Sequence, residues 1–161
     1  MLLLPSDMVL SLVVPAFNEA GRIEATLRDA LAYLGTHAER FEILVVDDGS
    51  TDNTAGVVAR LAEADERLRC LSLPQNRGKG AAVRAGMLAA VGHYVVFTDA
   101  DGSTPIFELA PMLARLQAGA DVVIGSRALP GSDVRTHQQP LREWLGRRFN
   151  QLLRTLLLTG F

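Results

Sequence analysis

The sequence has few of the residues that crosslink secreted domains or hold structural metals. Cys70 is its only cysteine, so the sequence provides neither a disulfide framework nor a thiolate zinc site. His37, His93 and His137 do not have the spacing of metal ligands. These absences imply a reducing environment on the cytosolic side.

Long apolar runs are also absent. No uninterrupted run reaches the roughly 18 apolar residues that a membrane-spanning helix needs. The opening stretch, MLLLP, is too short for a signal peptide and lacks its basic flank. We therefore expect a chain that does not cross a membrane. Its 161 residues, 48% of them hydrophobic and 21% charged, are enough for one globular domain with a substantial core.

The charge of the chain is small but unevenly distributed. A formal net charge of -2 gives no general case for nucleic-acid binding. Residues 127–161 nevertheless carry +4, whereas residues 1–126 carry -6. The basic C-terminal segment therefore needs a local explanation.

Short apolar runs alternate with longer amphipathic segments. The runs predict buried strands at 9–15, 41–46, 68–73, 93–98 and 120–126. Apolar residues at helical spacing predict helices at 19–34, 51–64, 80–91 and 105–117. Ser50, Thr51 or Asp52 can cap the second helix, and Pro105 suits the first turn of the fourth. This alternation predicts an α/β fold with a mostly parallel, Rossmann-like sheet that has helices on both faces.

A polar stretch follows every predicted strand. In chain order the stretches are PAFNEA (15–20), DDGSTD (47–52), QNRGKG (75–80), DADGS (99–103) and SR (126–127). A single stretch such as DDGSTD is also compatible with a turn and a helix cap. Because the carboxyl ends of parallel strands meet at one edge, however, the five together favour one site for a metal-bound, phosphorylated ligand.

Asp99 and Asp101 lie two residues apart, directly after an apolar strand. On extended or turning backbone, residues at this spacing face roughly the same way, so both carboxylates can reach one hard divalent cation. Two oxygen ligands and open coordination suit Mg²⁺ or Mn²⁺. The alternative is an ordinary solvated acidic loop.

The NRGKG stretch does not complete either common phosphate-binding motif. A dinucleotide fingerprint requires glycine where Val83 stands, and a Walker loop requires serine or threonine where Gly80 stands. The glycines instead allow the loop to pass close to a ligand, with Arg77 and Lys79 supplying positive charge. A flexible turn with solvated cations is the alternative.

Five segments in this order resemble family 2 glycosyltransferases with the GT-A fold: VVPAFNEAGRIEATL, VVDDGSTDNT, NRGKGAAVRAGM, FTDADGSTP and VIGSR. The resemblance covers roughly residues 9–160 and is strongest to polyprenyl-phosphate glycosyltransferases, which include dolichyl-phosphate glucose and mannose synthases. It implies that a sugar is transferred, with inversion, from a nucleotide diphosphate sugar to a polyprenyl phosphate. The expected location is the cytoplasmic face of a membrane.

The resemblance also implies roles for individual residues. Those expected to bind the nucleotide sugar are Pro15, Ala16, Phe17, Glu19, Asp48, Lys79 and Asp99. Asp48 would read the base, and Asp99 and Asp101 would hold the metal and the diphosphate. Arg127 would bind the acceptor phosphate and complete the catalytic set with the two aspartates, and Arg142 is a candidate second acceptor-phosphate ligand.

Two departures from the family pattern are informative. Gly102, Ser103 and Thr104 follow the paired aspartates, as in the glucosyltransferases, whereas mannose synthases tend to have a bulkier sequence there. UDP-glucose is therefore favoured over GDP-mannose as the donor. The chain also stops at LLLTGF, where family members continue into a segment around an Asp-Thr-Gln-Cys-Gly-like motif. We therefore expect an incomplete chain, which retains much of the donor site and lacks turnover.

The last part of the chain has an apolar helical stripe flanked by arginines. We expect residues 1–139 to form the catalytic domain and residues 140–161 to form an amphipathic helix on an anionic membrane, near the lipid acceptor. The same pattern fits a helix packed on the sheet or on a partner subunit. Two other functions stay open: a soluble transferase or nucleotidyltransferase of the same fold, and a noncatalytic nucleotide-sugar-binding module.

Overall fold

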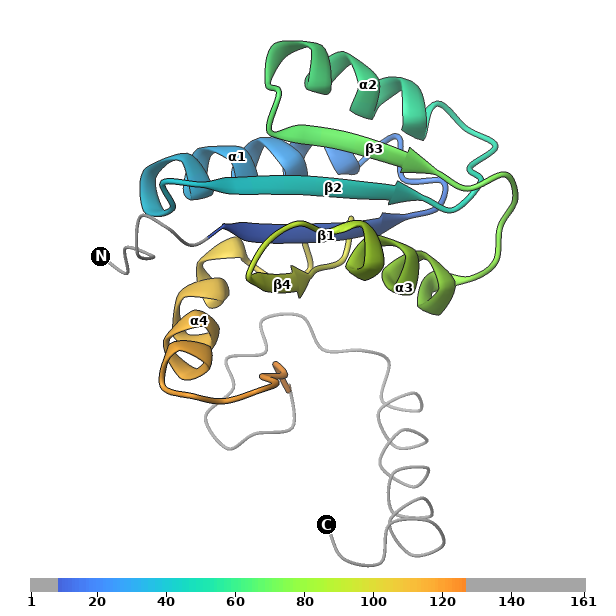
Figure 1. Ribbon diagram of the computed structural model, residues 1–161. Coiled ribbons are helices and arrows are strands. Elements are labelled where there is room, and N and C mark those ends of the chain that lie inside the picture. The colour runs from blue at the N-terminus through green and yellow to red at the C-terminus, as the bar shows by residue number, and fades with distance from the viewer. Residues whose placement is uncertain (1–8, 127–161) are drawn as a thin grey trace, which may run out of the picture. The chain divides into compact units, whose positions relative to one another are not determined.

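The computed structural model describes residues 9–126 (Figure 1). Strands and helices alternate, as the sequence predicts. The elements are β1 (Leu10–Ala16), α1 (Ile23–His37), β2 (Phe41–Asp47), α2 (Thr54–Ala64), β3 (Leu68–Ser72), α3 (Lys79–Ala89), β4 (Tyr94–Phe97), the 3-10 turn η1 (Ile106–Glu108) and α4 (Leu109–Gln117).

The four strands form one parallel sheet in the order β3-β2-β1-β4. In β1, Leu10 pairs with Phe41 of β2 on one side and with Tyr94 of β4 on the other. The chain therefore moves outward from β1 to β3 and then returns past β1 to form β4. Such a reversal opens a crevice at the carboxyl ends of the strands, which is where ligands bind in sheets of this kind. The predicted α/β, Rossmann-like architecture is confirmed.

The core has two apolar layers, one on each face of the sheet. Leu12 and Val14 of β1 pack with buried residues of α1, α2 and α4. Val13, which points to the opposite face, packs with Ala82 of α3. A Cβ on Gly86 of α3 would lie 2.3 Å from the Val13 side chain, so glycine allows this helix to approach the sheet closely.

Charged and polar side chains are also buried where α3 leads into β4. Glu42 of β2 is only 8% exposed. Its Oε1 atom accepts hydrogen bonds from the Ser11 hydroxyl (2.5 Å) and the Val91 N–H (2.9 Å), and its Oε2 atom accepts one from Arg69 Nε (2.7 Å). This carboxylate therefore ties β1, β3 and the α3–β4 connection to β2.

The prediction of a fifth strand at 120–126 is wrong. Residues 121–126 form no strand in the structure, and Val122 and Ile124 are 78% and 81% exposed. An apolar composition is not sufficient for a strand, because its N–H and C=O groups also need a neighbouring strand as partner.

Two further predictions concern membranes and domains. Within residues 9–126, no helix combines the length and the apolar character that crossing a bilayer requires. The predicted boundary after residue 139 and the predicted amphipathic helix at 140–161 lie outside the described residues.

Candidate functional site

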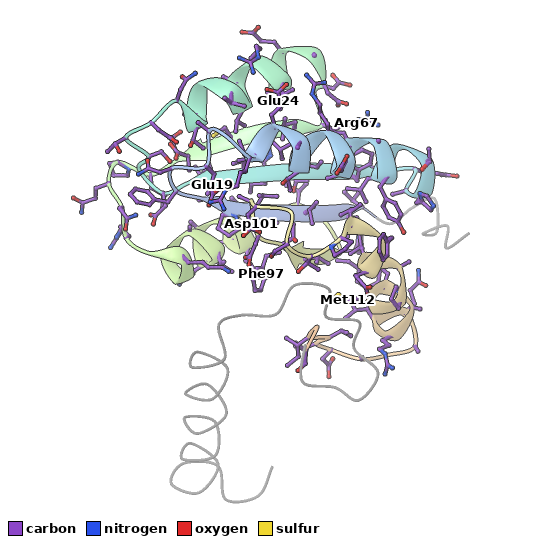
Figure 2. All side chains as sticks on the ribbon, turned by 180° about the vertical axis from the view of Figure 1, so that it is seen from behind. Glu19, Glu24, Arg67, Phe97, Asp101 and Met112 are labelled. Carbon is purple, nitrogen blue, oxygen red and sulfur yellow. The ribbon has the colours of Figure 1, made fainter. Side chains whose placement is uncertain are left out.

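A cleft of about 370 Å³ lies at the carboxyl edge of the sheet. Its lining comes from the end of β1, the start of α3 and the loops that follow the strands: Pro15, Ala16, Phe17, Glu19, Asp48, Asn76, Lys79, Ala82, Asp99, Ala100 and Asp101. All predicted nucleotide and metal residues within the described range are among them. Figure 2 shows Glu19 and Asp101 on the same side of the sheet. Their individual roles remain predictions.

Asn76, Ala82 and Ala100 also line the cleft, and the sequence analysis did not select them. Asn76 lies in the QNRGKG stretch, so its position after β3 was an available signal. Ala100 stands between the two aspartates, and Ala82 lies on the face of α3 that packs on the sheet. A small apolar residue carries no chemical signature in a sequence.

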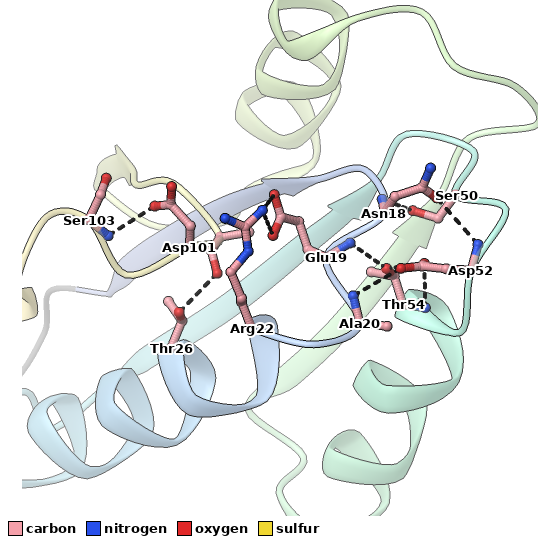
Figure 3. Close-up of polar contacts among 11 residues, drawn as sticks. Asn18, Glu19, Ala20, Arg22, Thr26, Ser50, Asp52, Thr54, Asp101 and Ser103 are labelled. Atoms are coloured by element: carbon pink, nitrogen blue, oxygen red, sulfur yellow. Dashed lines mark hydrogen bonds and ion pairs between the residues drawn. The ribbon is translucent and has the colours of Figure 1, made fainter. Parts of the chain in front are cut away.

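The segment after β1 is held against the loop after β2 by reciprocal hydrogen bonds (Figure 3). Asn18, with φ 56°, accepts a hydrogen bond from Thr51 N–H on its side-chain oxygen (2.8 Å), and its own N–H donates to the Ser50 hydroxyl (2.9 Å). The N–H of Glu19 donates to the Thr54 hydroxyl (2.8 Å). The prediction that Ser50, Thr51 or Asp52 caps α2 is wrong, because the N-cap is Asn53 and no side-chain cap bond forms. Ser50 and Thr51 instead bind Asn18, which holds the segment with Phe17 and Glu19 at the cleft.

Glu19 and Arg22 form an ion pair at the start of α1 (Figure 3). Arg22 Nη2 donates to Glu19 Oε1 (2.9 Å), and it contacts Oε2 (2.7 Å) as an ion pair without a hydrogen bond. The Glu19 side chain is 18% exposed, whereas that of Arg22 is 61% exposed. Sequence reasoning selected Glu19 but missed Arg22, the arginine that pairs with it.

Asp48 follows β2 and is almost fully buried, at 2% exposed. Its two carboxylate oxygens accept the N–H groups of Arg77 (2.9 Å) and Gly78 (2.7 Å), which precede α3. The structure therefore joins the predicted base-reading residue to the NRGKG stretch. Two separate sequence motifs form one piece of the site.

Lys79, the first residue of α3, forms an ion pair with Asp99, which follows β4. Both side chains are partly exposed to the cleft, at 58% and 43% respectively. The ammonium group therefore neutralises one of the two predicted metal-binding carboxylates. A cation that binds Asp99 must compete with Lys79.

Asp101 is held in place by its own loop. The N–H of Ser103 donates to Asp101 Oδ1 (2.9 Å), and this bond, together with the Ser103 hydroxyl and the nearby charge of Arg22, lowers the pKa of Asp101. The Thr26 hydroxyl of α1 donates to the carbonyl oxygen of Ala100 (2.9 Å), which attaches this loop to α1 (Figure 3). Asp101 is therefore an ionised carboxylate on a fixed loop.

The cleft has an excess of negative charge. Four carboxylates, those of Glu19, Asp48, Asp99 and Asp101, line it with one ammonium group, that of Lys79. No group of three potential metal-ligating side chains occurs within residues 9–126. Mg²⁺ and related ions commonly bind through one or two carboxylates and take their remaining ligands from water and substrate phosphates. The donor set therefore fits a divalent ion that binds together with a phosphorylated ligand.

The predicted acceptor-phosphate residues, Arg127 and Arg142, lie outside the described residues. The structure brings the predicted donor residues together at the carboxyl edge of the sheet.

Comparison with known proteins identifies the family. Residues 11–160 match the family described as glycosyl transferase family 2. Over 160 residues the chain is 39% identical to a dolichyl-phosphate beta-glucosyltransferase of Trichomonas vaginalis, a match that covers 92% of this chain and 47% of that relative. The chain thus spans about half the length of this curated relative.

Solved structures give the same fold. A mannosyltransferase from Pyrobaculum calidifontis, in complex with GDP-Man and Mn²⁺, is 36% identical with a TM-score of 0.52 over 57% of this chain and 27% of that chain. Glucosyl-3-phosphoglycerate synthase from Mycobacterium tuberculosis, in complex with Mn²⁺, uridine diphosphate and phosphoglyceric acid, is 29% identical with a TM-score of 0.53 over 72% of this chain and 41% of that chain.

Proposed function

Because this chain belongs to glycosyl transferase family 2, we propose that it forms the nucleotide-sugar-binding part of a metal-dependent, inverting glycosyltransferase. The donor is a nucleotide diphosphate sugar, and the acceptor is a polyprenyl phosphate. The observation that carries the proposal is the cleft at the carboxyl edge of the sheet, where four carboxylates and Lys79 converge.

The charges in the cleft support a metal-bound diphosphate. A diphosphate alone would be repelled by the carboxylates, so its binding requires added positive charge. Asp99 and Asp101 would hold a divalent cation, which supplies charge neutralisation for the departing nucleoside diphosphate. Lys79, the ion-pair partner of Asp99, contributes a further positive charge.

The reaction needs little acid–base chemistry from the protein. A polyprenyl phosphate is mostly dianionic at neutral pH, because its second pKa is about 6, so a phosphate oxygen attacks the anomeric carbon directly. The new oxygen–carbon bond forms as the bond to the diphosphate oxygen breaks, and the diphosphate leaves with the electron pair. The protein residues therefore act by binding and orientation.

Glucose is the favoured sugar. Gly102, Ser103 and Thr104 after the paired aspartates support this choice, as does the identity to a dolichyl-phosphate beta-glucosyltransferase. UDP-glucose is accordingly the favoured donor. GDP-mannose is the second candidate, because the solved mannosyltransferase complex with GDP-Man and Mn²⁺ is 36% identical to this chain.

We place the reaction at the cytoplasmic face of a membrane, with Arg127 and Arg142 binding the acceptor phosphate. The basic, amphipathic pattern of residues 140–161 supports this location. The test compares how much of the whole chain, and how much of a shortened chain of residues 1–139, floats with anionic liposomes. Equal flotation of the two chains would mean that residues 140–161 do not bind the membrane.

The deciding experiment is calorimetric titration of the chain with UDP-glucose and with GDP-mannose. Each titration is made with Mg²⁺, with Mn²⁺ and after addition of EDTA. Metal-dependent binding of UDP-glucose in preference to GDP-mannose is the expected result. Binding of neither donor by a folded sample would contradict the donor-site proposal for this chain.

A further inference from the structure

Asp48 has a second role that its predicted contact with the nucleotide base does not describe. We propose that Asp48 is a positioning residue, which fixes the segment Arg77–Gly78 and thereby places the ammonium group of Lys79 for the diphosphate. This inference rests on the proposed function, and it assigns part of the diphosphate recognition to a residue that does not need to touch the diphosphate.

The carboxylate of Asp48 binds main-chain groups of the segment before α3. Each of its oxygens accepts one main-chain N–H, from Arg77 at 2.9 Å and from Gly78 at 2.7 Å. Only 2% of the residue is exposed. Hydrogen bonds from N–H groups to a buried, charged acceptor are stronger than bonds between neutral groups. The carboxylate is therefore mainly a backbone ligand of the segment before α3.

The loops after β2 and β3 approach each other closely at Gly49. Gly49, next to Asp48, has φ 67°, and a Cβ there would lie 2.7 Å from the Asn76 nitrogen and 2.6 Å from the Gln75 carbonyl carbon. Glycine therefore lets the loop after β2 touch the backbone of the loop after β3. The Asp48 N–H donates to the Ala16 carbonyl oxygen (2.8 Å), so the anchor itself is attached to the end of β1.

The segment bound by Asp48 leads directly into the cleft through Lys79. Lys79 directly follows Gly78, begins α3 and pairs with Asp99. Its side chain is 58% exposed, so packing constrains it little. The point from which this flexible side chain starts therefore limits which positions its ammonium group can reach. Asp48 sets that starting point through the residue immediately before Lys79.

The anchor is tested without any ligand by limited proteolysis. Trypsin cleaves after Arg77 and after Lys79, on either side of the anchored glycine. Asp48→Asn keeps one carbonyl oxygen as acceptor and turns an amide N–H₂ toward the other main-chain donor. We expect cleavage at these two bonds to be faster by about tenfold or more, the effect of losing one charge-assisted hydrogen bond.

Asp47→Asn is the matched control. Asp47, the last residue of β2, is also buried, at 4% exposed, but its carboxylate accepts the N–H of Ser50 (3.1 Å) from the loop that directly follows. Cleavage after Arg77 and Lys79 should therefore stay near the wild-type rate. If both variants keep the circular dichroism spectrum of the folded protein and are cleaved at equal rates after Arg77 and Lys79, the proposal that Asp48 fixes this segment is overturned.

Hydrogen exchange of the unmodified chain avoids the risk that a variant does not fold. The Arg77 and Gly78 amides should exchange at least about tenfold more slowly than in an unstructured peptide, because both donate to a buried carboxylate. Exchange of both amides at the peptide rate would also overturn the proposal.

The link to Lys79 is tested with Mn²⁺-pyrophosphate, which has no base, and with uridine monophosphate, which has one. Asp48→Asn and Lys79→Met should each weaken binding of Mn²⁺-pyrophosphate, and the double variant should be no weaker than Lys79→Met. Additive losses would mean that Asp48 acts on pyrophosphate independently of Lys79, and loss of uridine monophosphate binding with pyrophosphate binding unchanged would mean that Asp48 acts on the base; either result would overturn the link. Failure of UDP-glucose binding alone would count against the proposed donor and leave the anchor readouts unaffected.

Discussion

Lys79 and Asp99 form an ion pair across the cleft, between the first residue of α3 and the residue two positions after β4. The pair joins a predicted nucleotide-binding cation to a predicted metal-binding carboxylate. Its two partners have different uses once a metal-bound diphosphate enters: the carboxylate suits the metal and the ammonium suits a phosphate oxygen. The structure therefore predicts that a metal ion and the Lys79 ammonium group compete for Asp99, which the sequence alone does not indicate.

Lys79→Met should have opposite effects on two ligands. Binding of Mn²⁺ alone should become stronger by up to about fivefold, because the competing ammonium is removed from a surface ion pair. Binding of the Mn²⁺–UDP complex should weaken by about tenfold or more, because a charged phosphate contact is lost. Calorimetry with each ligand measures both. Arg84→Met, an exposed cation on the same helix, is the control and should change neither.

Asp101→Asn should remove metal-dependent donor binding while the fold is retained. The asparagine oxygen still accepts the Ser103 N–H, so the loop keeps its conformation and only the carboxylate charge is lost. We expect affinity for the Mn²⁺–UDP complex to fall at least about tenfold. Asp29→Asn, an exposed residue of α1, controls for net charge. Equal affinity of the two variants for the Mn²⁺–UDP complex would mean that Asp101 does not bind the metal.

The hydrogen bonds between Asn18 and the loop after β2 should contribute to the free energy of unfolding. Asn18→Ala removes the acceptor of the Thr51 N–H (2.8 Å) and places alanine at φ 56°. Urea unfolding should show a loss of about 1 to 3 kcal/mol. Asn18→Gly also loses the acceptor but tolerates the left-handed backbone, so it should be about 1 kcal/mol more stable than Asn18→Ala. Equal stability of the two variants would mean that backbone conformation contributes little there.

The sequence predicted those features that depend on local pattern. Apolar runs and helical periodicity identified the four strands and four main helices. The rule that parallel strands share a carboxyl edge located the site, and the family resemblance named eight residues that line the cleft. The prediction of a strand at 120–126 failed because strand formation requires a neighbouring strand to pair with, in addition to apolar residues.

The features that the sequence did not predict are contacts between loops. Asn18 and Thr51 are 33 positions apart, and Asp48 and Gly78 are 30 positions apart. Each pair meets only because β1, β2 and β3 lie side by side in the sheet. The residue types alone indicated a turn and a helix cap, and the strand order determined which loops those polar groups would bind.

Glu42 is a charged residue inside the apolar strand FEILVV, and it provides the clearest test of how pH acts on this fold. Burial raises the pKa of its carboxyl group, but the hydrogen bonds from Arg69, Ser11 and the Val91 N–H outweigh burial and lower it below the ordinary value of 4.5. The folded state therefore favours the ionised form. Its contribution to stability is complete above about pH 4.5, the ordinary value in the unfolded chain, and is lost as the pH falls through the lower folded value.

Glu42→Gln should accordingly destabilise the protein by about 1 to 3 kcal/mol at pH 7, because a neutral amide presents its own N–H₂ group to donors that need an acceptor. Urea unfolding at a series of pH values measures the difference from the wild-type protein. That difference should shrink as the pH falls below 4.5, since protonation also removes the charge of the wild-type carboxylate. Glu39→Gln, an exposed residue just before β2, should show almost no difference at any pH. A Glu42→Gln difference that stays constant down to the acid transition would mean that the side chain stabilises the fold by packing, and that its charge contributes nothing.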